Sequence, residues 1–226
     1  MKALSLQNFL GLIFDKEDQT CFTDSPYGTQ VSFNPKATDI FFCINALDPY
    51  QDLKPEKQWH RQNKPRRADH NVLKHRTFLL EMDKGSLEEQ RSYIASRVPY
   101  SAVTFSGGKS LHFLITLETP VSAEQYRKIS KQLLTLLPEA DRATKNPSRL
   151  SRLPFRQRPD GQFQELLELR ERIPNHELLD LLPEVPEVVP LTRDINNPTT
   201  REFMAIEIIN ASSNPDDFMN NIRLDG

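Results

Sequence analysis

Two absences narrow the class of protein before any motif is considered. The 226 residues include two cysteines, Cys21 and Cys43, too few for a disulfide framework and too few for a zinc finger without ligands from histidine. No apolar run approaches the roughly 20 residues that a membrane-spanning helix needs, and no internal repeat is present. We therefore expect a chain without membrane spans in a reducing cytosolic compartment.

Charge is unevenly distributed, although the net charge is only -2. Residues 177–226 hold ten acids and three bases, whereas residues 1–176 hold 21 acids and 26 bases. Bases cluster over residues 54–76 and over residues 142–158, and the second cluster contains six bases and no acid. Clustered bases with interleaved aromatic residues are typical of a surface that binds a polyanion, but a solvated charged face has a similar composition.

Apolar periodicity predicts an α+β fold. The expected strands are residues 77–83, 101–105, 111–117 and 163–169, and the expected helices begin at the capping-box pairs Ser86–Glu89 and Ser122–Gln125. The resulting β-α-β-β-α-β order is that of a split βαβ sheet, as in RNA-recognition-motif-like folds. A helix over residues 4–14 and a short strand over residues 40–44 would form an N-terminal α/β extension.

Composition divides the chain into two parts. We expect a folded core over residues 1–173, with an N-terminal part (1–76) and a motif-bearing sheet (77–173). From residue 174 the sequence is acidic and interrupted by prolines, which predicts a linker over 174–226 with a C-terminal helical tail. The tail helix is expected over residues 199–211, and it could pack on the core or on a following domain.

Two carboxylates share one face of the first expected strand. Glu81 and Asp83 are two residues apart, so their side chains point to the same side, with Cα atoms about 7 Å apart. Acids at the end of an apolar strand are costly to bury unless they are paired or bind metal, and two of them can converge on divalent cations. The alternative is that Asp83 only begins a turn and that Glu81 lies at a strand edge in solvent.

A glycine-containing segment over residues 106–112, Ser-Gly-Gly-Lys-Ser-Leu-His, joins the second and third expected strands. Its glycines free backbone N–H groups to face a phosphate, and Lys109 adds positive charge. It is not a Walker A loop, because Val103 stands where the first glycine would be and a strand follows instead of a helix. A simple hairpin turn and a core histidine at His112 are the alternatives.

A basic segment over residues 141–154 is the third feature. It begins with Asp141 and contains Arg149 and Arg152, whose guanidinium groups could clamp a polyphosphate with paired hydrogen bonds. A solvated basic loop is the alternative reading of the same residues.

In combination, these three features resemble the archaeo-eukaryotic primase superfamily, and more narrowly the primase-polymerases of phages, plasmids and other mobile elements. The resemblance extends over residues 33–169 and includes Arg66-Arg67-Ala68-Asp69-His70-Asn71-Val72, just before the acidic strand. It departs at Glu81, where many relatives have aspartate, and at Phe155, where a glycine is often found. The sequence has neither a zinc-binding cluster nor a helicase phosphate loop.

The resemblance implies a primase-type catalytic core, a template-directed nucleotidyltransferase that synthesises or extends primers on single-stranded DNA in replication. Glu81, Asp83 and Asp141 would be catalytic and would bind two divalent cations, Mg²⁺ or Mn²⁺. The residues that would bind the nucleoside triphosphate, an NTP or a dNTP, are Ser106, Lys109, His112, Arg149 and Arg152. A helicase domain or protein is an implied partner, and a mobile-element protein would work in the host-cell cytoplasm.

Two other functions stay open on the sequence. A non-catalytic single-stranded nucleic-acid-binding module with a ferredoxin-like sheet would need the basic loops, but not Glu81 and Asp83 beside His112. A metal-dependent nuclease would use the carboxylates, but it would leave Lys109 and the two arginines without a triphosphate to hold.

Overall fold

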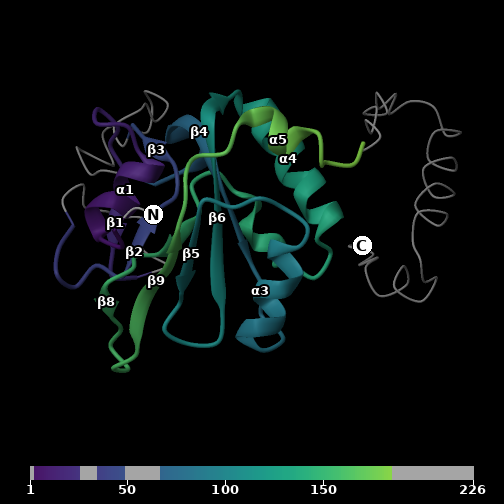
Figure 1. Cartoon of the computed structure of the whole chain (residues 1–226). Helices are drawn as coiled ribbons and strands as arrows, with labels where there is room; N and C mark the ends of the chain where they lie inside the picture. The colour runs from purple at the N-terminus through teal and green to yellow at the C-terminus, as the bar shows by residue number, and fades with distance from the viewer. Residues whose placement is uncertain (1–2, 26–34, 49–66, 185–226) are drawn as a thin grey trace, which may run out of the picture. The chain divides into compact units, whose positions relative to one another are not determined.

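The computed structural model describes residues 3–25, 35–48 and 67–184, and it places them in two antiparallel β-sheets with helices on both sides of the larger one (Figure 1). The larger sheet has the strand order β3-β4-β6-β5-β9-β8, and the smaller one has the order β1-β2-β7. The strands are β1 (Phe22–Thr23), β2 (Phe41–Cys43), β3 (Ala46–Leu47), β4 (Val72–Glu81), β5 (Ala102–Phe105), β6 (Leu111–Val121), β7 (Leu150–Arg152), β8 (Arg156–Gln157) and β9 (Phe163–Leu169).

Most of the helices begin at a residue whose side chain caps them. The described helices are α1 (Leu6–Ile13), α3 (Leu87–Ala95), α4 (Ala123–Leu136), α5 (Asn175–Leu179) and the 3₁₀ turns η2 (Asp69–Asn71) and η3 (Arg142–Lys145). Ser86 accepts a hydrogen bond from the Glu89 N–H, and the Glu89 carboxylate accepts one from the Ser86 N–H. Ser122 and Gln125 form the same reciprocal pair at the start of α4. Both expected capping boxes are therefore present, and each satisfies two backbone donors that a helix leaves free.

Successive residues of β4 face opposite sides of the large sheet. Phe78 and Leu80 belong to the hydrophobic core that α3 and α4 cover, whereas Leu79 packs with α1 and the small sheet. Thr77 faces the same side as Leu79, since its hydroxyl lies 3.2 Å from that of Thr116 on β6. By the same alternation, Glu81 at the end of β4 faces the space between the two sheets.

The mixed helix and sheet composition agrees with the expected α+β class, and β6 lies between β4 and β5. Two details differ from the expectation. First, β4 ends at Glu81, so Asp83 lies beyond the strand. Second, an RNA-recognition-motif-like sheet would place the fourth strand beside the first, but here β9 pairs with β5, and β3 occupies the other edge of β4.

The chain stays packed on the core beyond residue 173. Ile173 bridges Leu117 on β6, Leu178 of α5 is fully buried, and the Gln132 side chain donates a hydrogen bond to the Pro183 carbonyl at 2.7 Å. The expected tail helix over residues 199–211 lies outside the described residues, so the boundary at residue 173 stays a prediction. None of the described helices has the length and apolar character needed to cross a membrane.

Candidate active site

A pocket of about 930 Å³ gathers residues from six separate parts of the chain, and we call it the main pocket. Most of its wall comes from the end of β4, the turn between β5 and β6, the β7 segment and the β8–β9 hairpin, and single residues come from β2 (Phe41) and from the segment before η2 (Arg67). Seven of the eight predicted site residues line it: Glu81, Asp83, Ser106, Lys109, His112, Arg149 and Arg152. The eighth, Asp141, lies directly beside Glu81, since its N–H donates to the Glu81 carbonyl at 2.8 Å.

Glu81 and His112 are opposite one another in the pairing of β4 with β6, and their side chains bond directly. The Nε2 atom of His112 lies 2.9 Å from Oε2 of Glu81, and both side chains are largely buried. Nδ1 of His112 is 3.0 Å from the Ser151 hydroxyl on β7. If that hydroxyl donates to Nδ1, the neutral ring carries its proton on Nε2 and donates to Glu81, which is the tautomer we assign.

The Glu81 carboxylate is ionised at neutral pH. Burial by itself raises the pKa of Glu81, but the hydrogen bond from His112 and the charge of Arg149 outweigh burial and lower the pKa to about 2. The histidine therefore works as an orienting partner of this carboxylate rather than as an isolated core residue.

Arg149 bridges two of the predicted metal ligands. Its Nη2 atom lies 3.2 Å from Oε1 of Glu81 and 3.6 Å from Oδ2 of Asp141. The other oxygen of Asp141 accepts a hydrogen bond from the Ala143 N–H at 2.9 Å and so caps η3. The two carboxylates thus converge on one guanidinium group.

The segment that carries Arg149 is fixed by polar contacts to η2. Asp69 accepts hydrogen bonds from the Ser148 N–H at 3.1 Å and from the Ser148 hydroxyl at 2.6 Å. Arg67, which lines the main pocket, donates to the Ser148 carbonyl at 2.7 Å. Asn45 adds a further contact by donating to the Pro147 carbonyl at 2.9 Å. Arg149 is therefore held on an anchored loop rather than on a free one.

Asp83 lies at the mouth of the main pocket. Its side chain is 70% exposed, and Oδ1 is 3.5 Å from the Nζ atom of Lys109, which is equally exposed at 73%. The pair brings the loop after β4 close to the glycine turn that follows β5. Because solvent screens both groups, the pair leaves Asp83 available to a ligand.

The glycine turn between β5 and β6 is closed by its own two serines. The Ser106 N–H donates to the Ser110 carbonyl, and the Ser110 N–H donates to the Ser106 hydroxyl. Gly107 has a φ of 71°, a left-handed conformation that favours glycine, and Arg158 donates to its carbonyl at 2.9 Å. The Ser106 hydroxyl therefore shapes the turn from inside, while Lys109 points outward.

Gln90 of α3 supports the same turn from behind. Its amide nitrogen donates to the Gly85 and Lys109 carbonyls at 3.1 and 2.9 Å, and its amide oxygen accepts from the Leu111 N–H at 2.9 Å. The side chain is completely buried. The helix α3, which precedes the turn in the sequence, thus fixes the position of the turn.

The main pocket has more positive than negative charge. Its acids are Glu81, Asp83 and Asp160, and each is paired with a basic residue of the pocket: Arg149, Lys109 and Arg158. Two further arginines, Arg67 and Arg152, form no ion pair with any described residue. Burial, and then the charge of Arg158, lower the pKa of Arg152, whose guanidinium lies over the Phe41 ring at 4.3 Å. Such a pocket favours an anionic ligand.

Three residues of the site were not predicted from the sequence: Arg67, Arg158 and Gln90. The two arginines belong to the two basic clusters, and Arg67 is also part of the Arg66–Val72 segment. The clustering of bases in the sequence thus pointed to the two arginines. Nothing in the sequence around position 90 indicates that this helical glutamine contacts a distant turn.

The predicted acids are not the tightest carboxylate group in the described part of the chain. That group is Asp15, Glu17 and Asp18, whose carboxylate oxygens lie within 4.8 Å of one another. Lys74 contacts all three, at 3.0, 3.0 and 2.6 Å. The cluster could hold an ion by its geometry, but a lysine already occupies its centre.

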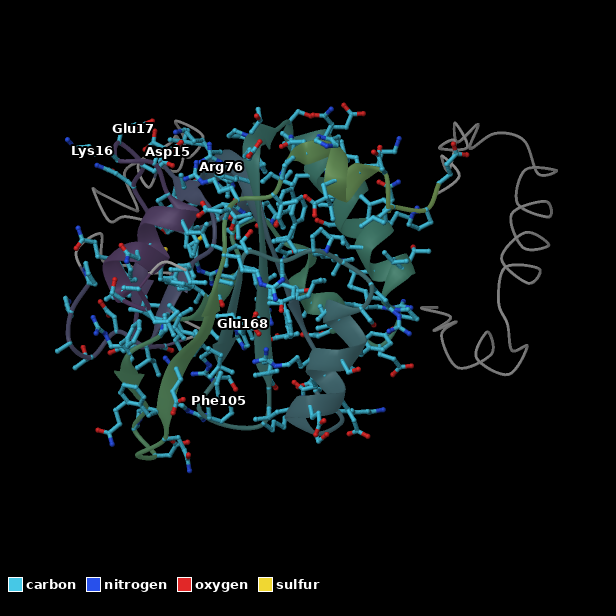
Figure 2. All side chains as sticks on the ribbon, in the orientation of Figure 1. Asp15, Lys16, Glu17, Arg76, Phe105 and Glu168 are labelled. Carbon is cyan, nitrogen blue, oxygen red and sulfur yellow. The ribbon has the colours of Figure 1, made fainter. Side chains whose placement is uncertain are left out.

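Two arginines neutralise this group further. Arg76 and Arg172 lie 2.8 and 2.7 Å from Oδ1 of Asp15, and the hydrogen bond from Arg76 is the main reason that the pKa of Asp15 falls well below its usual range. Figure 2 shows Asp15, Glu17 and Arg76 together near α1, far from Phe105 at the end of β5. The three acidic side chains are thus matched by three basic ones, and the cluster connects the end of α1 to β4. It is remote from the main pocket.

Comparison with known proteins supports the assignment of the fold. No protein-family model matches this sequence, and no curated protein is significantly similar to it. Among solved structures, the chain is similar to the AEP domain of the cyanophage S-2L primase-polymerase (PrimPol), with a TM-score of 0.62 and 18% sequence identity. The similarity covers 79% of this chain and 96% of that domain. At this identity it establishes the fold, which is that of an archaeo-eukaryotic primase domain.

Proposed function

We propose that the protein is a template-directed nucleotidyltransferase of the primase-polymerase type, which synthesises or extends primers on single-stranded DNA in replication. One observation carries this proposal. Residues from six separate parts of the chain converge on one cation-rich pocket, within a fold similar to that of a primase-polymerase domain. A non-catalytic nucleic-acid-binding module would gain nothing from the buried contact between Glu81 and His112.

The triphosphate of an NTP or dNTP would bind on the basic side of the main pocket. Arg152 and Arg67 have no carboxylate partner among the described residues, so their charge is available to phosphate oxygens. Lys109 is exposed at the pocket mouth and needs only to leave a screened ion pair with Asp83 to reach a phosphate. Ser106 and His112 would act by holding the turn and the carboxylate in place.

The acidic side of the pocket fits divalent cations by its chemistry. Glu81, Asp83 and Asp141 would hold Mg²⁺ or Mn²⁺, because these ions prefer carboxylate oxygens and the pKa of Glu81, about 2, keeps that group ionised. When bound, two such ions would stabilise the charge that develops during phosphoryl transfer. His112 orients Glu81, and Arg149 balances the charge of Glu81 and Asp141.

Two further parts of the proposal concern the surroundings of the core. A helicase domain or protein is the proposed partner, and the acidic sequence that follows α5 would connect to it. The ten acids and three bases over residues 177–226 would repel DNA, so this sequence is not expected to line the template site. For a mobile-element protein, the site of action would be the cytoplasm of the host cell.

Incubation of the full chain with a single-stranded DNA template, labelled NTPs or dNTPs, and Mg²⁺ or Mn²⁺ tests the proposal. We expect products that lengthen with time. Separate reactions with each nucleotide type and each metal ion would identify the preferred ones. DNA binding without any lengthening, with or without a supplied primer, would instead identify the non-catalytic module. Shortening of the template would identify the nuclease.

A further inference from the structure

A second pocket, of about 1130 Å³, lies between α4, η3 and the beginning of β4, and we call it the basic pocket. Four basic side chains line it: Arg127, Lys131, Arg142 and Lys145. None of them forms an ion pair with a described residue. Its acid is Asp69, whose Oδ1 is already bound to the Ser148 hydroxyl and N–H. The basic pocket therefore has a clear excess of positive charge.

The four bases form two pairs that face the same hollow. Arg127 and Lys131 are four residues apart on α4, and Arg142 and Lys145 are three residues apart on η3, so each pair lies on one face of its helix. Like charges at this spacing on an α-helix repel one another in the absence of an anion. Two such pairs from separate elements indicate that the fold brings positive charge together for a ligand.

A buried hydroxyl in the wall of the basic pocket gives an independent indication. Ser130 of α4 is 6% exposed and lines the pocket; its Oγ makes no hydrogen bond of normal geometry, and the side chain of Tyr126 lies beside it. A buried hydroxyl in this position can donate to an acceptor from a ligand in the pocket. Apolar side chains such as Leu134 and Pro138 complete the wall and could contact sugars or bases.

The basic pocket is separate from the main pocket, although the two share a wall. Arg67 and Arg149 line the main pocket, whereas Asp69 and Pro147 line the basic pocket, and the contact between Asp69 and Ser148 joins the two segments. The two sets of lining residues have no member in common. A ligand in the basic pocket therefore does not compete for the groups that we assign to the nucleotide.

We infer that the basic pocket binds the backbone phosphates of a single nucleic-acid strand. A compact triphosphate is usually cradled by backbone N–H groups at glycines, which the basic pocket does not contain. Its charges are instead carried by long side chains from two elements, which suits the repeated phosphates of a strand. The inference rests on the proposed function only in the choice of nucleic acid as ligand, and it requires no catalysis.

The test compares paired variants of the full chain with a matched control on the same helix. A labelled single-stranded oligonucleotide is titrated with Arg127→Ala/Lys131→Ala, with Arg142→Ala/Lys145→Ala and with Lys128→Ala, and anisotropy is read at several salt concentrations. Lys128 is exposed on α4 but does not line the basic pocket. Circular dichroism verifies that each variant is folded.

Each double variant should bind the strand on the order of twentyfold more weakly in 0.1 M salt. This value follows because each phosphate contact of a single strand contributes about 0.7 to the slope of log affinity against log salt, and two contacts are lost. The slope itself should fall by about 1.4, while Lys128→Ala should bind like the unchanged protein. Equal affinity and equal slope in all variants would overturn the inference, as would an equal loss in the Lys128→Ala variant.

Two further measurements separate other outcomes. If titration with a labelled nucleoside triphosphate shows a second site that the double variants lose, while strand affinity is unchanged, the basic pocket binds free nucleotide and the inference is wrong. A photo-crosslinker at Thr135→Cys, which lines the pocket, should attach to the strand, whereas one at Lys128→Cys should not. The natural cysteines are buried, which favours selective labelling. An unchanged protein that extends no primer, while the strand affinities of the variants differ as expected, would contradict the proposed function alone.

Discussion

Replacement of Asp83 by asparagine separates catalysis from stability more cleanly than replacement of Glu81 does. The Asp83 side chain is 70% exposed, lies beyond the end of β4, and makes a screened ion pair with Lys109 at 3.5 Å. Loss of such a pair changes the free energy of unfolding by less than about 1 kcal/mol. Glu81 is instead bound to His112 and Arg149 in a largely buried position, so its loss would leave both partners unsatisfied.

The expected effect of Asp83→Asn on activity is much larger than its effect on stability. Removal of one group that stabilises developing charge commonly reduces the rate by a factor of about 100 to 1000, equivalent to roughly 2.7–4 kcal/mol of activation free energy. We therefore expect primer extension to fall at least about a hundredfold, with an unchanged melting temperature and unchanged DNA affinity. Glu118→Gln, which removes an exposed carboxylate toward the far end of β6, is the matched control and should extend primers normally.

The assay combines primer extension, anisotropy with labelled DNA and thermal unfolding on the same preparations. Extension by Asp83→Asn at the rate of the unchanged protein would refute the assignment of this residue as a metal ligand. A parallel loss of DNA affinity would place Asp83 in template binding instead.

Three other predictions follow from the site and the core. Lys109→Ala should raise the Michaelis constant for the nucleotide and lower turnover, with DNA affinity unchanged. The reason is that a charge that acts on the triphosphate matters most in the transition state. A fall in DNA affinity alone would instead identify the turn as a template contact. The low pKa of Glu81, about 2 against an ordinary 4.5, contributes on the order of 3 kcal/mol of stability above pH 4.5, and this contribution is lost as the pH falls toward 2. His112→Ala removes the hydrogen bond that opposes burial, so circular dichroism should show acid unfolding at a higher pH; an identical pH profile would contradict this coupling. Truncation after residue 173 removes the buried leucine of α5 and should lower the melting temperature below that of the chain truncated after residue 184; equal melting temperatures of the two truncated chains would show that α5 adds nothing to the core.

Local signals in the sequence predicted the helices better than the arrangement of the sheet. The capping boxes at Ser86 and Ser122 were predictable because their hydrogen-bond partners are only three residues apart. The alternation of β4 placed Glu81 on the correct face for the same reason. The position of β9 was not predictable, because either edge of the sheet could accept it until β3 occupied one of them.

The site was predictable only as far as its residues lie in strong motifs. Arg67 and Arg158 reach the main pocket through contacts over 81 and 51 residues, to Ser148 and Gly107, and no local pattern encodes such distances. Phe155, one of the positions at which the sequence resemblance departs, has a φ of 62°, which is a conformation that favours glycine.

The contacts of Gln90 mean that the shape of the glycine turn is encoded outside the turn, in a helix that ends before β5 begins. Its amide serves two carbonyl oxygens and one N–H at once, a combination of donors and acceptor that no side chain other than an amide offers. A glutamate of the same size would set an anion against two carbonyl oxygens, and a leucine would remove the partner of all three backbone groups. Sequences that keep Ser-Gly-Gly-Lys-Ser but lose the amide would thus retain the motif without retaining its geometry. For a protein of this fold, a search for the turn alone would count such chains as nucleotide-binding, and the residue at the position of Gln90 would tell them apart.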